Sequence, residues 1–324
     1  MESHKALYLA PTFLLYLNDL PNISDKLQFF LFADDTNIYV ETEDLVTLEK
    51  FMNKELKKLY EWLCLNRLSL NISKTNFIIF HAINKPTTNI TLLINKIAIT
   101  EVNTVKYLGI LFDAHLTFKH HIAELNKKLS RSIGVLYKIR YLINTDLLCN
   151  LYYAIIYPFL LYGIAVWGNA PVTHLEPLHI LQKKFIRLAT YNDTIIYIEN
   201  KHTLHPSLPL FHQLCTINIF DIFKLQLGLF VFESINSIGP SNSIIQFTQT
   251  RLTHEYQTRN ATRGNLTQES VRTHRYGLKS ISYEGTKLWN LIPEEIRNKP
   301  NKKLFKYHYK KFLFTSYILT KINL

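Results

Sequence analysis

The stretch LQFFLFADDTNIYVE, residues 27–41, decides how the fold is interpreted. Two apolar arms flank the adjacent acids Asp34 and Asp35, and the pattern predicts two strands, 27–32 and 36–40, joined by a turn. Two like charges side by side repel each other, and burial increases that cost. A divalent cation between the carboxylates removes the cost, and magnesium prefers carboxylate oxygens together with substrate phosphates. A solvated hairpin turn is the alternative, because Asp is common in turns.

The composition favours an intracellular, nucleic-acid-binding protein. The chain has 324 residues, 47% of them hydrophobic, which is enough for one large or two ordinary domains. Its formal net charge of +12 suits a polyanionic partner, of which nucleic acid is the commonest. No GxGxxG or GxxxxGK[ST] string is present, so a glycine-rich nucleotide loop is not expected. Three scattered cysteines without a CxxC pair indicate a reducing compartment, the nucleus or the cytoplasm.

One segment requires a membrane test. Residues 147–173 contain no Asp, Glu, Lys or Arg, and about 20 apolar residues span a bilayer. The segment also contains Pro158, Gly163 and Pro171, which favour a buried helix that breaks before a proline. No secretory signal is expected at the start of the chain, where an acid stands at the second position. A membrane-associated protein remains the alternative.

The first 115 residues alternate between strand and helix patterns. Residues 42–65 are expected to form an amphipathic helix whose apolar positions step by three and four, with Asn66 as its stop signal. Residues 67–81 are expected to form strand, turn and strand, and residues 89–100 a hairpin about Asn95 and Lys96. Residues 104–113 look like one more apolar strand. This part is therefore predicted to be α+β with an antiparallel sheet.

The remainder is predicted to be mainly helical. Helices are expected at residues 116–141, 172–189 and 210–235, and Thr145 or Asp146 can cap a further helix. An extended stretch, residues 192–212, separates the last two of these helices. A tail that is rich in Thr, Asn, Arg and Lys begins at residue 239.

Several blocks in order resemble the reverse transcriptases of non-LTR retrotransposons, the LINE-like and jockey-type polymerases. LFADDTNIYV resembles their FADD hairpin, and PTFLLYLNDLP (11–21) resembles the segment before it. WLCLNRLSLNISKTNFIIF (62–80) and VKYLGILFDAHLTFKHHI (105–122) resemble segments that follow it. YPFLLYGIAVWG (157–168) resembles a thumb segment, and YEGTKLWNLIPEEIR (283–297) resembles the ends of such proteins. We therefore expect a C-terminal portion of such a polymerase.

The resemblance implies a division of the chain into three parts. A partial polymerase palm, an antiparallel sheet with helices, is expected over residues 1–115. A helical thumb-like region is expected over residues 116–236. A mixed, basic C-terminal extension is expected over residues 237–324.

The resemblance also implies site residues and partners. Asp34 would be the principal ligand of Mg²⁺ or Mn²⁺, and Asp35 its weaker neighbour, for two-metal nucleotidyl transfer. RNA template and DNA primer would be the partners, with no small-molecule cofactor. Lys74 would approach template or nucleotide phosphate, and a solvated turn lysine is its alternative. Further contacts to nucleic acid would come from a primer-grip strand and two basic helices: Tyr107, Leu108, Gly109, Lys127, Lys128, Arg131, Lys183, Lys184 and Arg187.

One feature of the family is missing from the sequence. Its polymerases carry a first catalytic Asp upstream of the hairpin, and only Asp19 and Asp25 precede Asp34 here. Asp19 already matches the segment before the hairpin, and the resemblance implies that the 324 residues do not include the fingers. We therefore expect an incomplete catalytic site, with weakly bound metal and no activity of this chain alone. A nucleic-acid-binding protein without catalysis is the second hypothesis.

Overall fold

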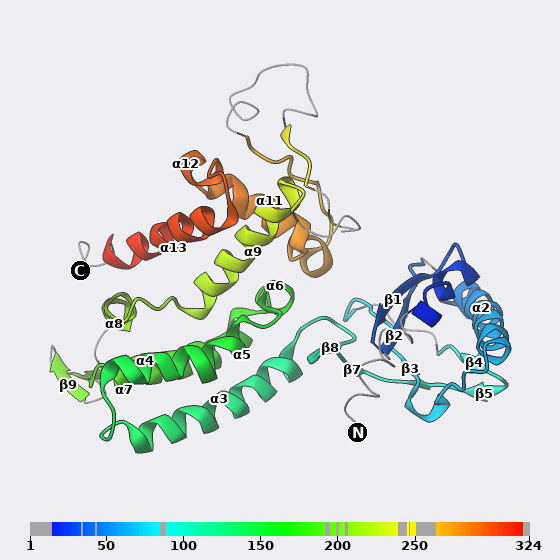
Figure 1. The fold of residues 1–324 in the computed structure, drawn as a ribbon, viewed down its shortest axis with the longest axis horizontal. Coiled ribbons are helices and arrows are strands. Elements are labelled where there is room, and N and C mark those ends of the chain that lie inside the picture. Colours follow the sequence, from blue (N-terminus) through cyan, green and yellow to red (C-terminus); the bar gives the residue numbers. More distant parts are fainter. Residues whose placement is uncertain are drawn as a thin grey trace. The chain divides into compact units, whose positions relative to one another are not determined.

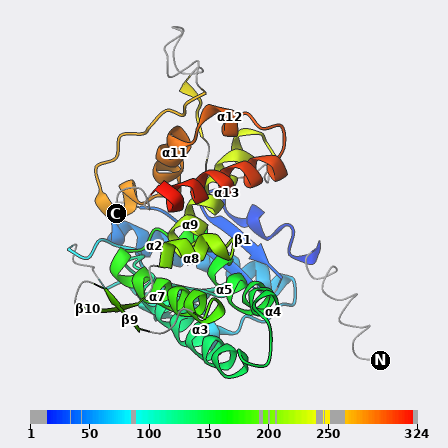
Figure 2. The same cartoon turned by 90° about the vertical axis from the view of Figure 1, so that its left-hand side faces the viewer.

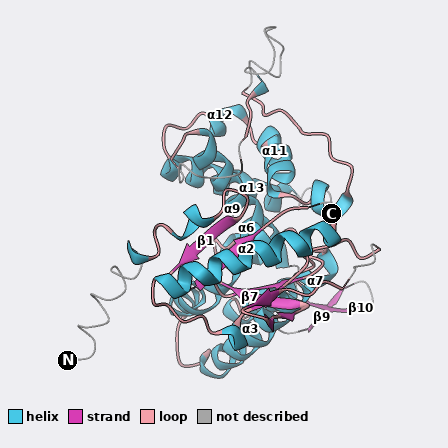
Figure 3. Ribbon diagram, turned by 90° about the vertical axis from the view of Figure 1, so that its right-hand side faces the viewer, coloured by secondary structure: helices cyan, strands magenta, loops and turns pink. Residues whose placement is uncertain are grey.

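A computed structural model describes residues 15–33, 35–42, 44–84, 89–191, 195–198, 201–204, 207–238, 245, 247–250 and 264–319. Most of the short strands lie between residues 28 and 113, and most of the helices follow from residue 119 on (Figures 1 and 3), a mixture of helix and strand that is compatible with the predicted α+β class. The chain divides into two compact units. The first is Met1–Tyr107 with Phe112–Leu116, and the second is Leu108–Leu111 with Thr117–Leu324.

The hairpin of the first unit has a two-residue turn. Strand β1 (Gln28–Phe32) pairs antiparallel with β2 (Asp35–Tyr39), and Phe32 lies opposite Asp35. Ala33 has a φ of 51°, in the left-handed region that tight hairpin turns use. Asp35 is therefore the first residue of a strand, whereas the sequence placed it in the turn. Asp34 lies outside the described residues.

Helix α2 (Leu45–Leu65) supports the hairpin from one side. It begins three residues later than predicted, because the Asp44 carboxylate caps it and accepts the N–H groups of Val46 (3.2 Å) and Thr47 (3.0 Å). It ends at Asn66, as predicted. Its buried stripe and the inner face of the hairpin share one hydrophobic core, whose helix residues are Met52, Leu56, Leu59 and Leu63.

The rest of the first unit consists of very short strands. Strands β4 (Leu93–Ile94) and β5 (Ile97–Ala98) form the predicted hairpin, and Asn95 and Lys96 both have left-handed φ. Strand β3 (Asn76–Phe77) pairs with β6 (Thr100–Glu101) in parallel, which the sequence did not suggest.

The strand expected just after Arg67 is absent from the described residues. In its place, a 3₁₀ turn, η2 (Ile72–Lys74), follows Asn71. The Asn71 side chain accepts the Lys74 N–H at 3.3 Å, and such local bonds compete with strand pairing.

Residues 104–113 form a hairpin, and the prediction of one strand is wrong. Strands β7 (Thr104–Tyr107) and β8 (Ile110–Asp113) pair with each other. Leu108 has a φ of 44° and Gly109 a φ of 81°, so these two residues form the turn. An apolar residue in the first turn position hides this turn in the sequence.

Helices α3 (Lys119–Ile139) and α7 (Val172–Ala189) lie side by side in the second unit (Figure 1). Both match their predicted ranges closely. Helix α4 (Thr145–Leu151) is capped by Asn144, which accepts the Leu147 N–H at 2.8 Å, and not by Thr145 or Asp146. Asn144 has the extended backbone that a capping residue needs, whereas the helix already begins at Thr145.

The apolar segment 147–173 is broken into short pieces. A π-helical stretch, η3 (Tyr152–Ile156), leads into α5 (Tyr157–Leu161), and Gly163, with a φ of 62°, separates α5 from α6 (Ile164–Trp167). Among the described residues, no helix combines the length and the apolarity needed to cross a membrane.

A strand pair and two helices follow α7 in the second unit. A β9–β10 hairpin (Ile195–Ile198 and Lys201–Leu204) precedes α8 (Ser207–Gln213) and α9 (Ile219–Ile235). The predicted single helix 210–235 is thus two helices, because Cys215 adopts a left-handed φ of 50° between them.

Helices α11 (Ile281–Leu291) and α13 (Lys302–Leu319) pack on α9 (Figure 2). A second π-helical stretch, η5 (His274–Leu278), precedes α11, and α12 (Glu294–Arg297) joins α11 to α13. The aromatic core here contains Phe232, Trp289 and Phe305. The division into palm, thumb and extension stays a prediction.

Candidate functional site

The β1–β2 hairpin has one covered and one open face. Phe29, Leu31 and Ile38 pack against the core of α2. Residues directly opposite each other share a face of an antiparallel pair, so Asp35 lies on the same face as Phe32. Both side chains are exposed, Phe32 to 58%. The hairpin thus holds the Asp35 carboxylate at its tip on the open face.

The metal ligands that the structure describes are few. No group of three or more His, Cys, Asp or Glu side chains gathers anywhere in the described part of the chain. At the hairpin tip the described carboxylate is that of Asp35, and its neighbour Asp34 lies outside the described residues. Mg²⁺ in nucleotide-handling sites takes one or two carboxylates plus phosphate oxygens. The Asp35 carboxylate is therefore a suitable ligand for Mg²⁺, but the described residues supply only part of a ligand set.

The other site residues of the first unit are spread over separate elements. Lys74 is exposed at the end of η2, and Tyr107 is half-buried at the end of β7. These positions stay predictions as nucleic-acid contacts.

The turn Leu108–Gly109 is held within the second unit by a tyrosine. The Tyr162 hydroxyl donates to the Leu108 carbonyl at 2.5 Å. A Cβ at Gly109 would lie 3.5 Å from the ring of Tyr162. The turn is therefore covered closely by that ring, although Gly109 itself remains exposed.

Helix α3 presents a basic side to solvent. Leu125, Leu129 and Ile133 line its buried side. Its predicted contact residues are exposed and form no ion pair within the described part of the chain: Lys127, Lys128 and Arg131. Lys138 is exposed on the same side, one position short of the helix end.

Two of the three predicted cations of helix α7 are less accessible to a polyanion than the sequence suggested. Lys183 pairs with Glu176 at 3.2 Å, so its charge is largely offset. Arg187 keeps its charge but is half-buried, so its guanidinium is less accessible to a phosphate than an exposed one. Lys184 is exposed. The six predicted cations are therefore not equivalent, and those of α3 are the most open to a polyanion.

Sequence reasoning missed a cluster of aromatic rings where α3 ends. The buried guanidinium of Arg140 lies 4.8 Å from the ring centre of Tyr137, 4.5 Å from Tyr141 and 5.9 Å from Tyr191. We name these four residues the tyrosine cluster. The Tyr191 hydroxyl donates to the Arg140 carbonyl at 3.0 Å. The string YKIRY, residues 137–141, with aromatic and basic residues interleaved, is the sequence signal that could have revealed it.

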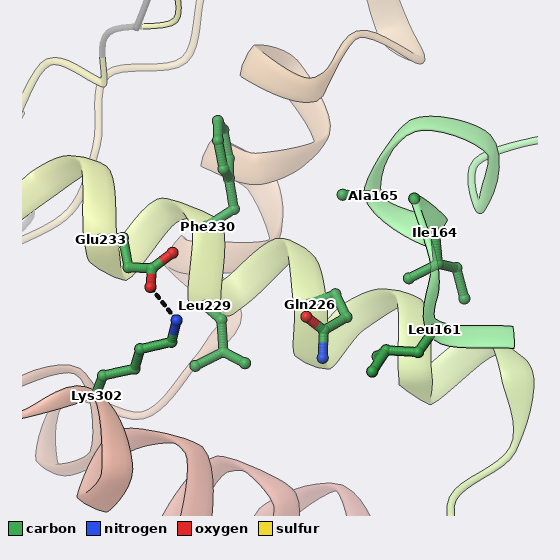
Figure 4. A pocket seen from close by; sticks show the side chains of 9 residues that line it. Leu161, Ile164, Ala165, Gln226, Leu229, Phe230, Glu233 and Lys302 are labelled. Atoms are coloured by element: carbon green, nitrogen blue, oxygen red, sulfur yellow. Dashed lines mark ion pairs between the residues drawn. The ribbon is translucent and has the colours of Figure 1, made fainter. Parts of the chain in front are cut away.

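A pocket of about 210 Å³ lies between the α5–α6 segment, α9 and the start of α13 (Figure 4). Apolar side chains such as Leu161, Ile164 and Leu229 form most of its wall. Glu233 and Lys302 pair with each other across one end, so their charges offset each other. None of the predicted site residues lines this pocket.

The chain is similar in sequence to polymerases of mobile elements. It is 27% identical over 190 residues to the RNA-directed DNA polymerase from mobile element jockey of Drosophila funebris, a match of 55% of this chain and 20% of that polymerase. It is 26% identical over 203 residues to the probable RNA-directed DNA polymerase from transposon X-element of Drosophila melanogaster, which is 60% of this chain and 22% of that protein. A third match is the probable RNA-directed DNA polymerase from transposon BS of the same organism, 28% identical over 120 residues.

These matches confirm the resemblance that the ordered blocks indicated. The chain is related to the RNA-directed DNA polymerases of retrotransposons, and its relatives are of the jockey, X-element and BS type. The matched region spans about a fifth of the length of the first two relatives. No protein-family model matches the chain, and no solved structure matches it.

Proposed function

We propose that this chain contains the later part of the palm and the thumb of an RNA-directed DNA polymerase that handles RNA template and DNA primer. The observation that carries the proposal is the hairpin of the sequence Phe-Ala-Asp-Asp, whose strands pair up to Phe32 and Asp35 and leave the Asp35 side chain exposed at the tip. The matches to mobile-element polymerases support it. Helices α3 and α7 would then be thumb helices.

Asp34 and Asp35 are the residues whose carboxylates would hold Mg²⁺ or Mn²⁺. Such an ion, when bound, neutralises charge that develops on the phosphoryl group during nucleotidyl transfer. The protein contributes a stiff support, because both strands of the hairpin are paired up to Phe32 and Asp35. The open face of the hairpin leaves the Asp35 carboxylate accessible to phosphate oxygens.

We propose further that the 324 residues by themselves do not synthesise DNA. The family's site needs another carboxylate from a strand upstream of the hairpin. Asp19 stands before the 3₁₀ turn η1 (Leu20–Ile23), and Asp25 lies exposed in the turn before β1. Neither belongs to a described strand, which supports the proposal that this chain lacks that carboxylate.

Binding without catalysis is the function that these residues can carry alone. Lys127, Lys128 and Arg131 expose positive charge along one helix and have no described acidic partner. Phosphate contacts of this kind bind any sequence and weaken with salt.

The test combines binding and primer extension with the purified chain. On an RNA template with an annealed DNA primer, we expect a gel shift at low salt and no extension in Mg²⁺ or Mn²⁺. Robust extension would refute the proposal of inactivity. Failure to shift the template–primer even at low salt would refute the binding function.

A further inference from the structure

The basic side of α3 lies next to the exposed rings of the tyrosine cluster, at the end of the helix. Lys127, Arg131 and Lys138 follow one another at spacings of four and seven, which place them on one side of a helix. From Lys127 to Lys138 the row is about 16 Å long at 1.5 Å per residue, with exposed Gly134 and Val135 between Arg131 and Lys138. Tyr141 follows two residues after the helix ends at Ile139. We call this row of three cations with the exposed ring of Tyr141 the strip.

The tyrosine cluster is ordered by its arginine. Arg140 is 6% exposed, whereas Tyr137, Tyr141 and Tyr191 are 54%, 71% and 47% exposed. A guanidinium close to three rings attracts each of them through cation–π interaction. Tyr141 also accepts a hydrogen bond from the Arg140 guanidinium. The rings are thus held in place while much of their surface faces solvent.

A second contact fixes the cluster to both thumb-like helices. Tyr191 follows the end of α7, and its hydroxyl donates to the Arg140 carbonyl at 3.0 Å. The rings of Tyr141 and Tyr191 lie with centres 6.5 Å apart and planes tilted by 48°. Because these planes diverge, each ring can offer its free surface to a different flat group.

We propose that the tyrosine cluster is a stacking platform for unpaired nucleobases of a single strand, with the phosphates of that strand along Lys127, Arg131 and Lys138. Aromatic side chains beside a basic groove are the general means by which proteins bind single-stranded nucleic acid. Charge complementarity favours a nucleic acid over an uncharged partner, because the strip contains three cations and the chain has a net charge of +12. The proposal rests on the nucleic-acid-binding function proposed above, and it adds a site for single strands.

The test compares two ligands and matched variants by fluorescence anisotropy. The ligands are a fluorescein-labelled oligothymidine strand and the same strand with tetrahydrofuran abasic residues in place of its bases. The variants are Tyr141→Ala, Tyr137→Leu and Tyr141→Phe. Tyr307→Ala is the control, since Tyr307 is 62% exposed on α13 and lies outside the cluster. Circular dichroism verifies the fold of each variant.

We expect Tyr141→Ala and Tyr137→Leu to weaken binding of the oligothymidine about tenfold, and to leave binding of the abasic strand unchanged. Tyr141→Phe keeps the ring and should bind within about twofold of the parent chain, as should Tyr307→Ala. Equal losses on both strands, or no loss on either, would overturn the platform while leaving the phosphate contacts in place. If the parent chain shifts the template–primer but binds neither single strand at low salt, the platform fails while the proposed binding function stands. If it shifts no template–primer either, the proposed binding function fails as well.

Discussion

Phe32 and Asp35 are the last residues to pair across the β1–β2 hairpin, with two positions between them. Their side chains share the open face of the hairpin, while the opposite face packs on α2. The hydrophobic core therefore fixes the strands, whereas the exposed Asp35 side chain lies outside that core. Asp35 can therefore be replaced without loss of the fold.

Replacement of Asp35 by Asn should leave the fold almost unaffected. Asp35 is exposed and forms no ion pair among the described residues. Surface substitutions of this kind change the free energy of unfolding by about 0.5 kcal/mol or less. Urea unfolding followed by circular dichroism measures the change, and a loss above about 2 kcal/mol would mean that the carboxylate is structural.

Helix α2 should lose stability in acid through its cap. Hydrogen bonds from the backbone N–H groups of Thr47 and Val46 lower the pKa of Asp44 below its ordinary value of 3.8. The stabilisation is present above that value and is lost as the pH falls through the lower, folded-state pKa. Hydrogen exchange of the first turn of α2 between pH 5 and 2 follows this loss. In Asp44→Ala the protection factors of this turn should be low at every pH, and protection equal to the parent at pH 5 would contradict the cap.

Two glycines of the second unit should respond in opposite directions to Ala. Gly163 has a φ of 62°, and an added Cβ would lie 2.4 Å from Cδ1 of Ile110, so Gly163→Ala should cost about 2 to 4 kcal/mol. Gly134 lies inside α3, and an added Cβ meets nothing within 4 Å, so Gly134→Ala should stabilise by about 1 kcal/mol. Thermal unfolding compares the two, and a stable Gly163→Ala variant would contradict the packing of Ile110 against the turn.

The second unit should become less stable between pH 7 and pH 5. Burial lowers the pKa of His121, and also that of His179, below the ordinary value of 6.5. Each imidazole is therefore favoured as the neutral form, and its stabilisation, present above pH 6.5, is lost as the pH falls through the folded-state pKa. The ring of Trp167 lies 5.6 Å from that of His121, so its fluorescence can report unfolding there.

The double variant His121→Gln, His179→Gln should show a flatter dependence of the unfolding midpoint on pH. His120→Gln is the control, because His120 lies on α3 next to His121 and its side chain is exposed. If the unfolding midpoint of His120→Gln depended on pH as weakly as that of the double variant, the two buried histidines would not be the cause of the pH dependence.

The basic side of α3 should set the salt dependence of duplex binding. Each phosphate contact contributes about 0.9 to the slope of log K against log salt. Lys127→Gln and Arg131→Gln should each lower the slope by about that amount. Lys287→Gln, an exposed lysine on α11, should not change it. Equal slopes for all variants would exclude this helix as a phosphate-binding surface.

Local signals predicted much of the fold. The stripe of α2 and its stop at Asn66, the Asn95–Lys96 turn, and the ranges of α3 and α7 all follow from short-range patterns. The errors lie where Leu108 and Cys215, two residues uncommon in turns, adopt left-handed φ. The break at Cys215 also had a sequence signal that was missed, since Asn218 caps α9. Tertiary packing determines where the chain turns at such positions, and hydrophobic periodicity alone does not reveal it.

The candidate site was predicted less completely. The acidic hairpin is visible in the sequence because two carboxylates interrupt an apolar run, although Asp35 proved to be a strand residue. The pairing of Lys183 with Glu176, seven positions away, could not be foreseen from charge alone. The tyrosine cluster joins Tyr191 to residues fifty positions earlier, and only the fold brings them together.

We propose above that Asp34 belongs to a polymerase metal site of which this chain holds only a part. A chimera that joins the upstream palm region of the jockey polymerase to this chain would supply the missing part. We predict magnesium-dependent primer extension by the chimera, a loss of at least a hundredfold in Asp34→Asn, and no loss in Asp25→Asn. A folded chimera that extends primers equally well with Asp34→Asn, or that extends none at all, would contradict the account.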